Sequence, residues 1–158
     1  MKGLILQKDG RWYTDMNTPF EKVSELSERY NWLVTNPENC YEKESLRRVF
    51  GREVQWYTGP ELKTLLGQEE AQWIWGVFSG FPQNISKEEV LRYPVPWAND
   101  YEGYWKNPLT IQHPLAEVEI TAWDSTLTLF ISRNEQLLEK FAALYPACED
   151  LETYNAQP

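Results

Sequence analysis

The sequence predicts an α+β fold: a single domain, residues 1–158, in which a mixed, largely antiparallel sheet carries helices packed mainly on one face. Alternation of apolar and polar residues within 116–133 indicates a β-hairpin, and an amphipathic helix follows it directly. Four capping boxes of the form Ser/Thr-x-x-Glu mark helix starts between strand-like segments. A chain of 158 residues is long enough to bury a core of its own.

The first half of the chain alternates strand-like and helix-like segments. The strands are short apolar or aromatic runs bounded by turn residues, whereas the helices begin at capping boxes or at acidic residues. In order, the predicted elements are a strand at 1–6, a turn at 9–10 with a returning strand at 11–13, a helix from 18, a strand at 31–35, a helix at 42–50, a strand at 53–57 and a helix at 58–66.

The segment Gln72–Phe78 contains almost no polar residue. Such a run is typical of a strand buried on both faces, so we place it at the centre of the sheet and expect Trp73 and Trp75 on opposite faces. A capping box at Ser86 then predicts a short helix that ends before Tyr93.

Residues 93–115 form a predicted long loop, because four prolines exclude regular structure over much of it. The loop carries five large aromatic residues: Tyr93, Trp97, Tyr101, Tyr104 and Trp105. Long loops are uncommon in compact domains and are often functional, so these rings are candidates for a pocket or a recognition surface. The alternative, which we favour, is that the rings fold over one face of the sheet as a local core.

The hairpin is expected to bury one face and to expose the other. Glu117 and Glu119 alternate with Val118 and Ile120, so the two carboxylates are predicted on the wet face, about 7 Å apart. Asp124 lies in the turn that follows the first strand. These three acids are therefore candidates for a charged binding surface.

The residues after the hairpin are predicted to be helical and strongly acidic. A capping box at Ser132 starts the helix, and residues 155–158 are expected to fray. The net charge of the chain is −9, and residues 115–158 hold eight acids against two bases, a balance of −6. Such a surface repels nucleic acid and anionic membranes and attracts a basic protein partner. The alternative is that the charge only keeps the protein soluble.

Two features of composition predict a cytoplasmic location. The two cysteines, Cys40 and Cys148, have no CxxC spacing, which favours a reducing compartment, with one disulfide as the alternative. No apolar run approaches the roughly 20 residues that a membrane-spanning helix needs.

The sequence contains no motif that assigns catalysis or a cofactor. His113 is the only histidine, which excludes a site with several imidazole ligands and a histidine relay. No glycine-rich phosphate motif, GxSxG elbow or calcium-binding loop is present, so we predict no cofactor and no metal. Glu117 and Glu119 are the best carboxylate pair for glycoside hydrolysis, although acids on a hairpin face more commonly contact only water.

The end of the chain resembles the ending of small uncharacterised bacterial cytosolic proteins that are similar to immunity proteins of polymorphic toxin systems. The similar segments are EVEITAWDSTLTLFIS, NEQLLEKFAALYP and EDLETYN, and their most distinctive piece is Ala122-Trp123-Asp124-Ser125. The resemblance covers roughly the last third of the chain and carries no catalytic residue. It implies a bacterial α+β domain that works by binding.

These observations favour a non-catalytic protein-binding module, in its most specific form an immunity-type inhibitor with an acidic binding surface for a basic protein. The alternative is a small-molecule or carbohydrate-binding domain that uses the Tyr93–Trp105 loop, with Glu117 and Glu119 catalytic if it is a hydrolase. A third interpretation is a housekeeping protein with no visible property other than its fold. The candidate binding residues are Glu117, Glu119, Asp124, Trp97, Tyr101, Tyr104 and Trp105.

Overall fold

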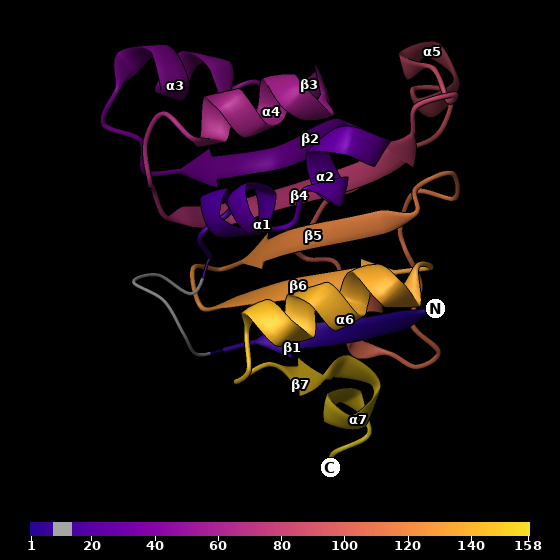
Figure 1. Ribbon diagram of the computed structural model, residues 1–158. Coiled ribbons are helices and arrows are strands. Elements are labelled where there is room, and N and C mark those ends of the chain that lie inside the picture. The colour runs from indigo at the N-terminus through magenta and orange to yellow at the C-terminus, as the bar shows by residue number, and fades with distance from the viewer. Residues whose placement is uncertain (8–13) are drawn as a thin grey trace.

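Seven strands form one sheet in the computed structural model, which describes residues 1–7 and 14–158. The strand order is β3-β2-β4-β5-β6-β1-β7, and every described pair of neighbouring strands runs antiparallel. The sheet and its helices confirm the predicted α+β fold (Figure 1). The turn predicted at 9–10 and the strand predicted at 11–13 lie outside the described residues.

The two longest strands, β2 and β4, lie side by side. The strands are β1 (Lys2–Leu6), β2 (Tyr30–Asn39), β3 (Val54–Thr58), β4 (Trp73–Pro82), β5 (Val118–Trp123), β6 (Leu127–Ser132) and β7 (Glu149–Asp150). The helices are α1 (Asn17–Lys22), α2 (Glu25–Arg29), α3 (Glu44–Val49), α4 (Gly59–Leu66), α5 (Lys87–Val90), the 3-10 helix η1 (Gly103–Trp105), α6 (Glu135–Leu144) and α7 (Leu151–Asn155). None of the described helices is long and apolar enough to cross a membrane.

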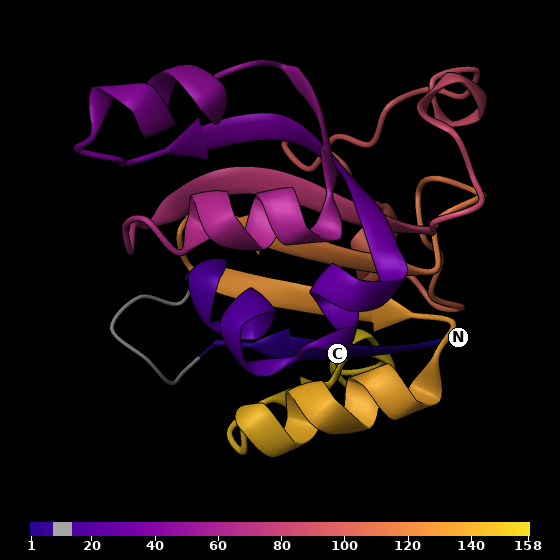
Figure 2. The ribbon, with the colours of Figure 1, turned by 45° about the horizontal axis from the view of Figure 1, so that its top comes forward.

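Most of the helices cover one face of the sheet, as predicted (Figure 1). Figure 2 shows α1, α2, α4 and α6 as a layer in front of the strands. The core between this layer and the sheet is rich in buried aromatic rings, including Trp32, Phe78, Phe130 and Phe141. Burial of these rings provides much of the free energy that holds the helices on the sheet.

The opposite face of the sheet is also covered. The long connection between β4 and β5 lies on it together with α7, and a second core forms there from residues such as Leu33, Val77, Leu129 and Leu151. Successive side chains of a strand point to opposite faces, so the central strands are buried on both sides. The sheet is therefore the middle layer of the molecule.

Two of the four predicted helix starts are confirmed. The side chain of Thr58 accepts a hydrogen bond from the backbone N–H of Glu61 at the start of α4. Ser86 and Glu89 form a complete capping box at the start of α5. These caps satisfy backbone N–H groups that have no partner inside the helix.

The starts of α1 and α6 differ from the prediction. Thr18 lies inside α1, and its hydroxyl donates to the carboxylate of Asp15. Asn134, and not Ser132, caps α6 by accepting hydrogen bonds from two backbone N–H groups of the first turn. Ser132 is still part of β6, and its hydroxyl donates to a backbone carbonyl just before β5. The strand pairing thus delays the helix by two residues.

Trp73 and Trp75 contact opposite cores, as predicted. Trp73 is fully buried in the core under the helix layer, which we call the helix-side core. Trp75 is only partly buried and packs against the core on the opposite face, under the long connection, which we call the loop-side core. Residues two apart in a regular strand share a face. The pairing of β2 with β4 is irregular between Glu38 and Asn39, opposite these two residues, and such a bulge changes the direction of the side chains.

The C-terminal residues form β7 and α7, which the sequence did not predict. Leu151 is fully buried, and it holds α7 against the loop-side core. Asn155, which was predicted to fray, ends α7, and its side-chain amide donates to the carbonyl of Tyr104 at 2.9 Å. The end of the chain is therefore fastened to the body of the molecule up to this residue.

Candidate functional site: an acidic groove beside α6

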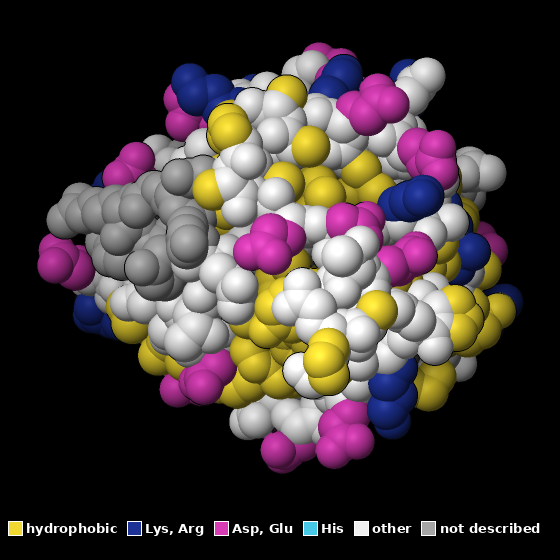
Figure 3. Space-filling model, turned by 90° about the horizontal axis from the view of Figure 1, so that it is seen from below, with side chains coloured by type: hydrophobic (Ala, Val, Ile, Leu, Met, Phe, Trp, Pro, Cys, Tyr) yellow, Lys and Arg dark blue, Asp and Glu magenta, His cyan; other side chains and the backbone are white. Residues whose placement is uncertain are grey.

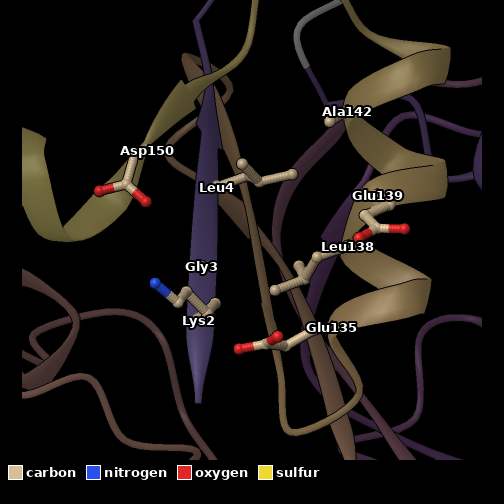
Figure 4. Close-up of a pocket in the computed structure, with 8 residues that line it drawn as sticks. All are labelled: Lys2, Gly3, Leu4, Glu135, Leu138, Glu139, Ala142 and Asp150. Carbon is tan, nitrogen blue, oxygen red and sulfur yellow. The ribbon is translucent and has the colours of Figure 1, made fainter.

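A groove lies between α6 and the outer strands β1 and β7 (Figure 4). Its cavity volume is about 240 Å³. Leu4 of β1 and Leu138 and Ala142 of α6 form an apolar floor. Leu4 and Ala142 keep part of their surface accessible to solvent. The groove therefore offers apolar area that a partner would bury.

Three exposed carboxylates border this floor. Glu135 and Glu139 come from successive turns of α6, and Asp150 lies on the opposite side, on β7 (Figure 4). Lys2 is the one cation among the described residues that line the groove. The lining thus carries more negative than positive charge, and it attracts basic groups. We call Glu135, Glu139 and Asp150 the acidic banks.

Packing and a helix cap hold the groove in shape. Leu138 and Phe141 belong to the buried stripe of α6, and Phe141 stacks on Phe130 of β6. Asp150 accepts a hydrogen bond from the backbone N–H of Thr153 at 2.8 Å and thereby caps α7. The acidic banks are therefore carried by fixed elements and not by a loose loop.

The lower end of the molecule carries the same combination of apolar and acidic surface. Seen from below, apolar side chains gather in patches and acidic side chains lie at their borders (Figure 3). The strand β7 and the helix α7 lie at this end (Figure 1). Glu149 of β7 is exposed, but it pairs with Ile5, which faces the opposite core, so its side chain lies on the other face of the sheet from Asp150.

Two other hollows lack an excess of one charge. One, of about 600 Å³, lies between α3, β3 and α4, and its lining contains one arginine and one glutamate. The other, of about 300 Å³, lies between α2 and α6, and its lining contains two acids and two bases. The groove beside α6 is therefore the one of these three whose charge matches the acidic balance of the chain.

The three acids predicted to form a surface patch do not lie together. Glu119 is fully buried, so its predicted place on the wet face is wrong. Glu117 is half-buried before β5, and Asp124 is exposed in the turn after it. The length of β5 separates these two residues by about 20 Å. The burial of Glu119 also removes the solvent-facing carboxylate pair that the hydrolase alternative requires.

Glu119 belongs to a buried hydrogen-bond network under the loop. The hydroxyl of Tyr104 donates to one carboxylate oxygen at 2.7 Å, and the backbone N–H of Gln112 donates to the other at 3.2 Å. The side chains of Gln112 and Thr121 donate to the Tyr104 hydroxyl at 2.7 and 3.1 Å. Burial raises the pKa of Glu119 to about 7, and the hydrogen bonds from Tyr104 and Gln112 limit this rise.

The aromatic loop forms a local core, which was the favoured of its two interpretations. Tyr104 is 1% exposed, Tyr101 packs on its ring, and Trp105 packs on Trp123. Trp97 is the most exposed of the candidate rings, at 40%. Three of the four candidate rings thus stabilise the packing of the loop on the sheet, because their surface is largely removed from water.

His113 holds this loop in place through hydrogen bonds of its ring to the backbone. Its ring is buried, with Nε2 2.8 Å from the carbonyl oxygen of Val90 and with Nδ1 accepting from the N–H of Leu115 at 3.2 Å. Burial lowers the pKa of His113, which favours the neutral ring. Both ring nitrogens have backbone partners, so this histidine acts as a structural residue.

The groove residues were not among the sequence candidates. The lining comes from both ends of the chain, from residues 2–4, 135–142 and 150. Two signals were present in the sequence: the acidic excess after residue 115, and the four-residue spacing of Glu135 and Glu139 beside an apolar stripe. Neither signal indicates that β1 pairs with β6 and brings Leu4 next to α6.

Comparisons with protein-family models, with curated proteins and with solved structures find no match to this chain. No relative supplies a partner or a residue role.

Proposed function

We propose that this chain is a protein-binding module that holds a basic segment of a partner protein in the groove beside α6. The observation that carries the proposal is an apolar floor between carboxylates from two different elements. Burial of apolar area supplies affinity, while the charges raise the association rate and orient the partner.

The charge of the whole chain supports a basic partner. The net charge is −9, and residues 115–158, which contain α6 and β7, carry −6 of it. A field of this sign speeds the approach of a cationic protein, and added salt weakens it. An immunity-type inhibitor that neutralises a basic toxin in the cytoplasm is the most specific form of this proposal.

The test uses a partner that is captured from the source cells, identified, purified and then bound to variants of the chain. The groove variant neutralises or reverses the acidic banks and raises the net charge by five: Glu135→Lys, Glu139→Lys and Asp150→Asn. Asparagine at position 150 keeps a side chain able to cap α7. The control variant makes the same change in net charge at exposed acids away from the groove: Glu53→Lys, Glu70→Lys and Glu88→Gln.

The measurement is the association rate at low and at high salt. We expect the groove variant to associate at least about tenfold more slowly at low salt and to lose most of its salt dependence, while the control changes by about twofold or less. Equal slowing of both variants would show that net charge acts without the groove. Unchanged binding of the groove variant would refute the proposal.

A further inference from the structure

The partner's binding element can be specified from the shape of the groove, an inference that rests on the proposed function. We infer that the bound segment is a basic amphipathic helix of about three turns, lying alongside α6. Its apolar stripe packs on Leu4, Leu138 and Ala142, and its lysine or arginine residues face the acidic banks on both sides.

The helical layer ends before the sheet does. Among the described helices, α6 is the last on its face in strand order and packs on β6 and β1, whereas the sheet continues to β7 (Figure 1). The helix α7 contributes Leu151 to the opposite core, so it does not cover this strip. Packed helices lie about 8–10 Å apart, and a helix at that distance from α6 would complete the layer over β1 and β7.

The spacing of the acids matches the period of a helix. Glu135 and Glu139 are four residues apart on α6, so a parallel or antiparallel helix meets them with cations that are also about one turn apart. Asp150 faces them across the groove, toward the end at which Ala142 lies, whereas Lys2 lies at the Glu135 end (Figure 4). Lys2 repels a cation. The basic residues of the partner helix that face β1 and β7 are therefore expected near Asp150.

The competing modes fit the groove less well. A strand added at the sheet edge would find only two residues in β7, the second of which caps α7. Pockets that bind small molecules usually have volumes of roughly 300–1,000 Å³, and the volume of the groove is about 240 Å³. A groove of this volume can hold a few apolar side chains from a helix of a partner protein.

The experiment compares fluorescent peptides of about 14 residues, a length at which a helix is marginal alone and gains from binding. Two peptides share one leucine and lysine composition: in the first the leucines recur at i, i+3, i+4 and i+7, and in the second they alternate. A third keeps the helical pattern with glutamate in place of lysine. The variant Ala142→Arg fills the groove floor, and Ala143→Arg places the same charge on an exposed neighbouring position of α6.

Binding is measured by fluorescence anisotropy and peptide helicity by circular dichroism. We expect the helix-patterned lysine peptide to bind at least about tenfold more tightly than the other two and to gain helicity. Its affinity should fall by at least about tenfold with Ala142→Arg and by less than about twofold with Ala143→Arg. If the alternating peptide binds as tightly and is equally sensitive to Ala142→Arg, the helix is wrong and the proposed function stands. If Ala142→Arg changes the affinity of neither lysine peptide, the helical binding mode and the proposed function are both wrong.

Discussion

At the scale of the residue, Glu119 links the stability of the fold to pH. Burial raises its pKa to about 7, from the value of 4.5 expected when it is exposed. The folded chain then holds this proton more tightly than the unfolded chain does. The contribution of Glu119 to the free energy of unfolding is therefore full below about pH 4.5, falls as the pH rises to about 7, and stays constant above that. Its size is at most about 3 to 4 kcal/mol, at about 1.4 kcal/mol per pKa unit.

The substitution Glu119→Gln should remove this fall, because a neutral amide has no proton to lose. We expect the free energy of unfolding of the variant, measured with urea between about pH 4.5 and 8, to rise relative to wild type as the pH increases. His113 acts with the opposite sign, since its lowered pKa makes its contribution disappear as the pH falls below about 6.5, but it affects both proteins equally. Glu88→Gln, at an exposed position, is the control. A constant difference between wild type and Glu119→Gln across this range would contradict the burial of an ionisable carboxyl.

Ser79 is the second residue with an energetic consequence. It faces Glu119 across the pair β4 and β5, it is fully buried, and its hydroxyl has no hydrogen-bond partner within the described residues. We expect Ser79→Ala to raise the free energy of unfolding by about 1 kcal/mol, because a buried unpaired hydroxyl is costly. Thr35→Val is the comparison, since the Thr35 hydroxyl donates to the carbonyl of Pro96 at 2.6 Å and its loss should destabilise by about 1 kcal/mol or more. Urea midpoints that move the same way in both variants would refute this assignment.

At the scale of the element, the start of α6 fixes the position of the two glutamates that border the groove. Asn134 caps this helix, and Glu135 and Glu139 on its first turns supply one acidic bank. We expect Asn134→Ala to lower the free energy of unfolding by about 1 kcal/mol and Asn134→Asp to retain the cap. Chemical denaturation measures both. A midpoint unchanged in Asn134→Ala would place the start of the helix elsewhere.

At the scale of the whole molecule, the net charge of −9 repels itself in the compact state. Added salt screens this repulsion, so the midpoint of thermal unfolding should rise between about 10 mM and 300 mM NaCl. The groove variant and its control both have a net charge of five units less negative, so both should show a smaller rise. Thermal unfolding followed by circular dichroism measures it. A salt response that is lost in one variant and kept in the other would assign the effect to local pairs, not to total charge.

Most of the elements were predictable because their causes are local, whereas β7 and α7 were not predicted. The caps at Thr58 and Ser86 depend on residues three positions away, and the alternation through Val118 and Ile120 is a property of the strand. The apolar run of β4 likewise indicated a central strand before any partner was known. Such signals lie within a few residues, where the backbone geometry is nearly constant.

Only the tertiary structure decided which surfaces face water. Glu119 has the pattern of an exposed acid, yet the loop folds back over it and Tyr104, 15 residues away, donates a hydrogen bond to it. The groove arises in the same way, because the pairing of β1 with β6 brings Leu4 from the start of the chain beside Leu138 near its end. Contacts between distant segments depend on how the strands are ordered in the sheet. No periodicity in the sequence records that order.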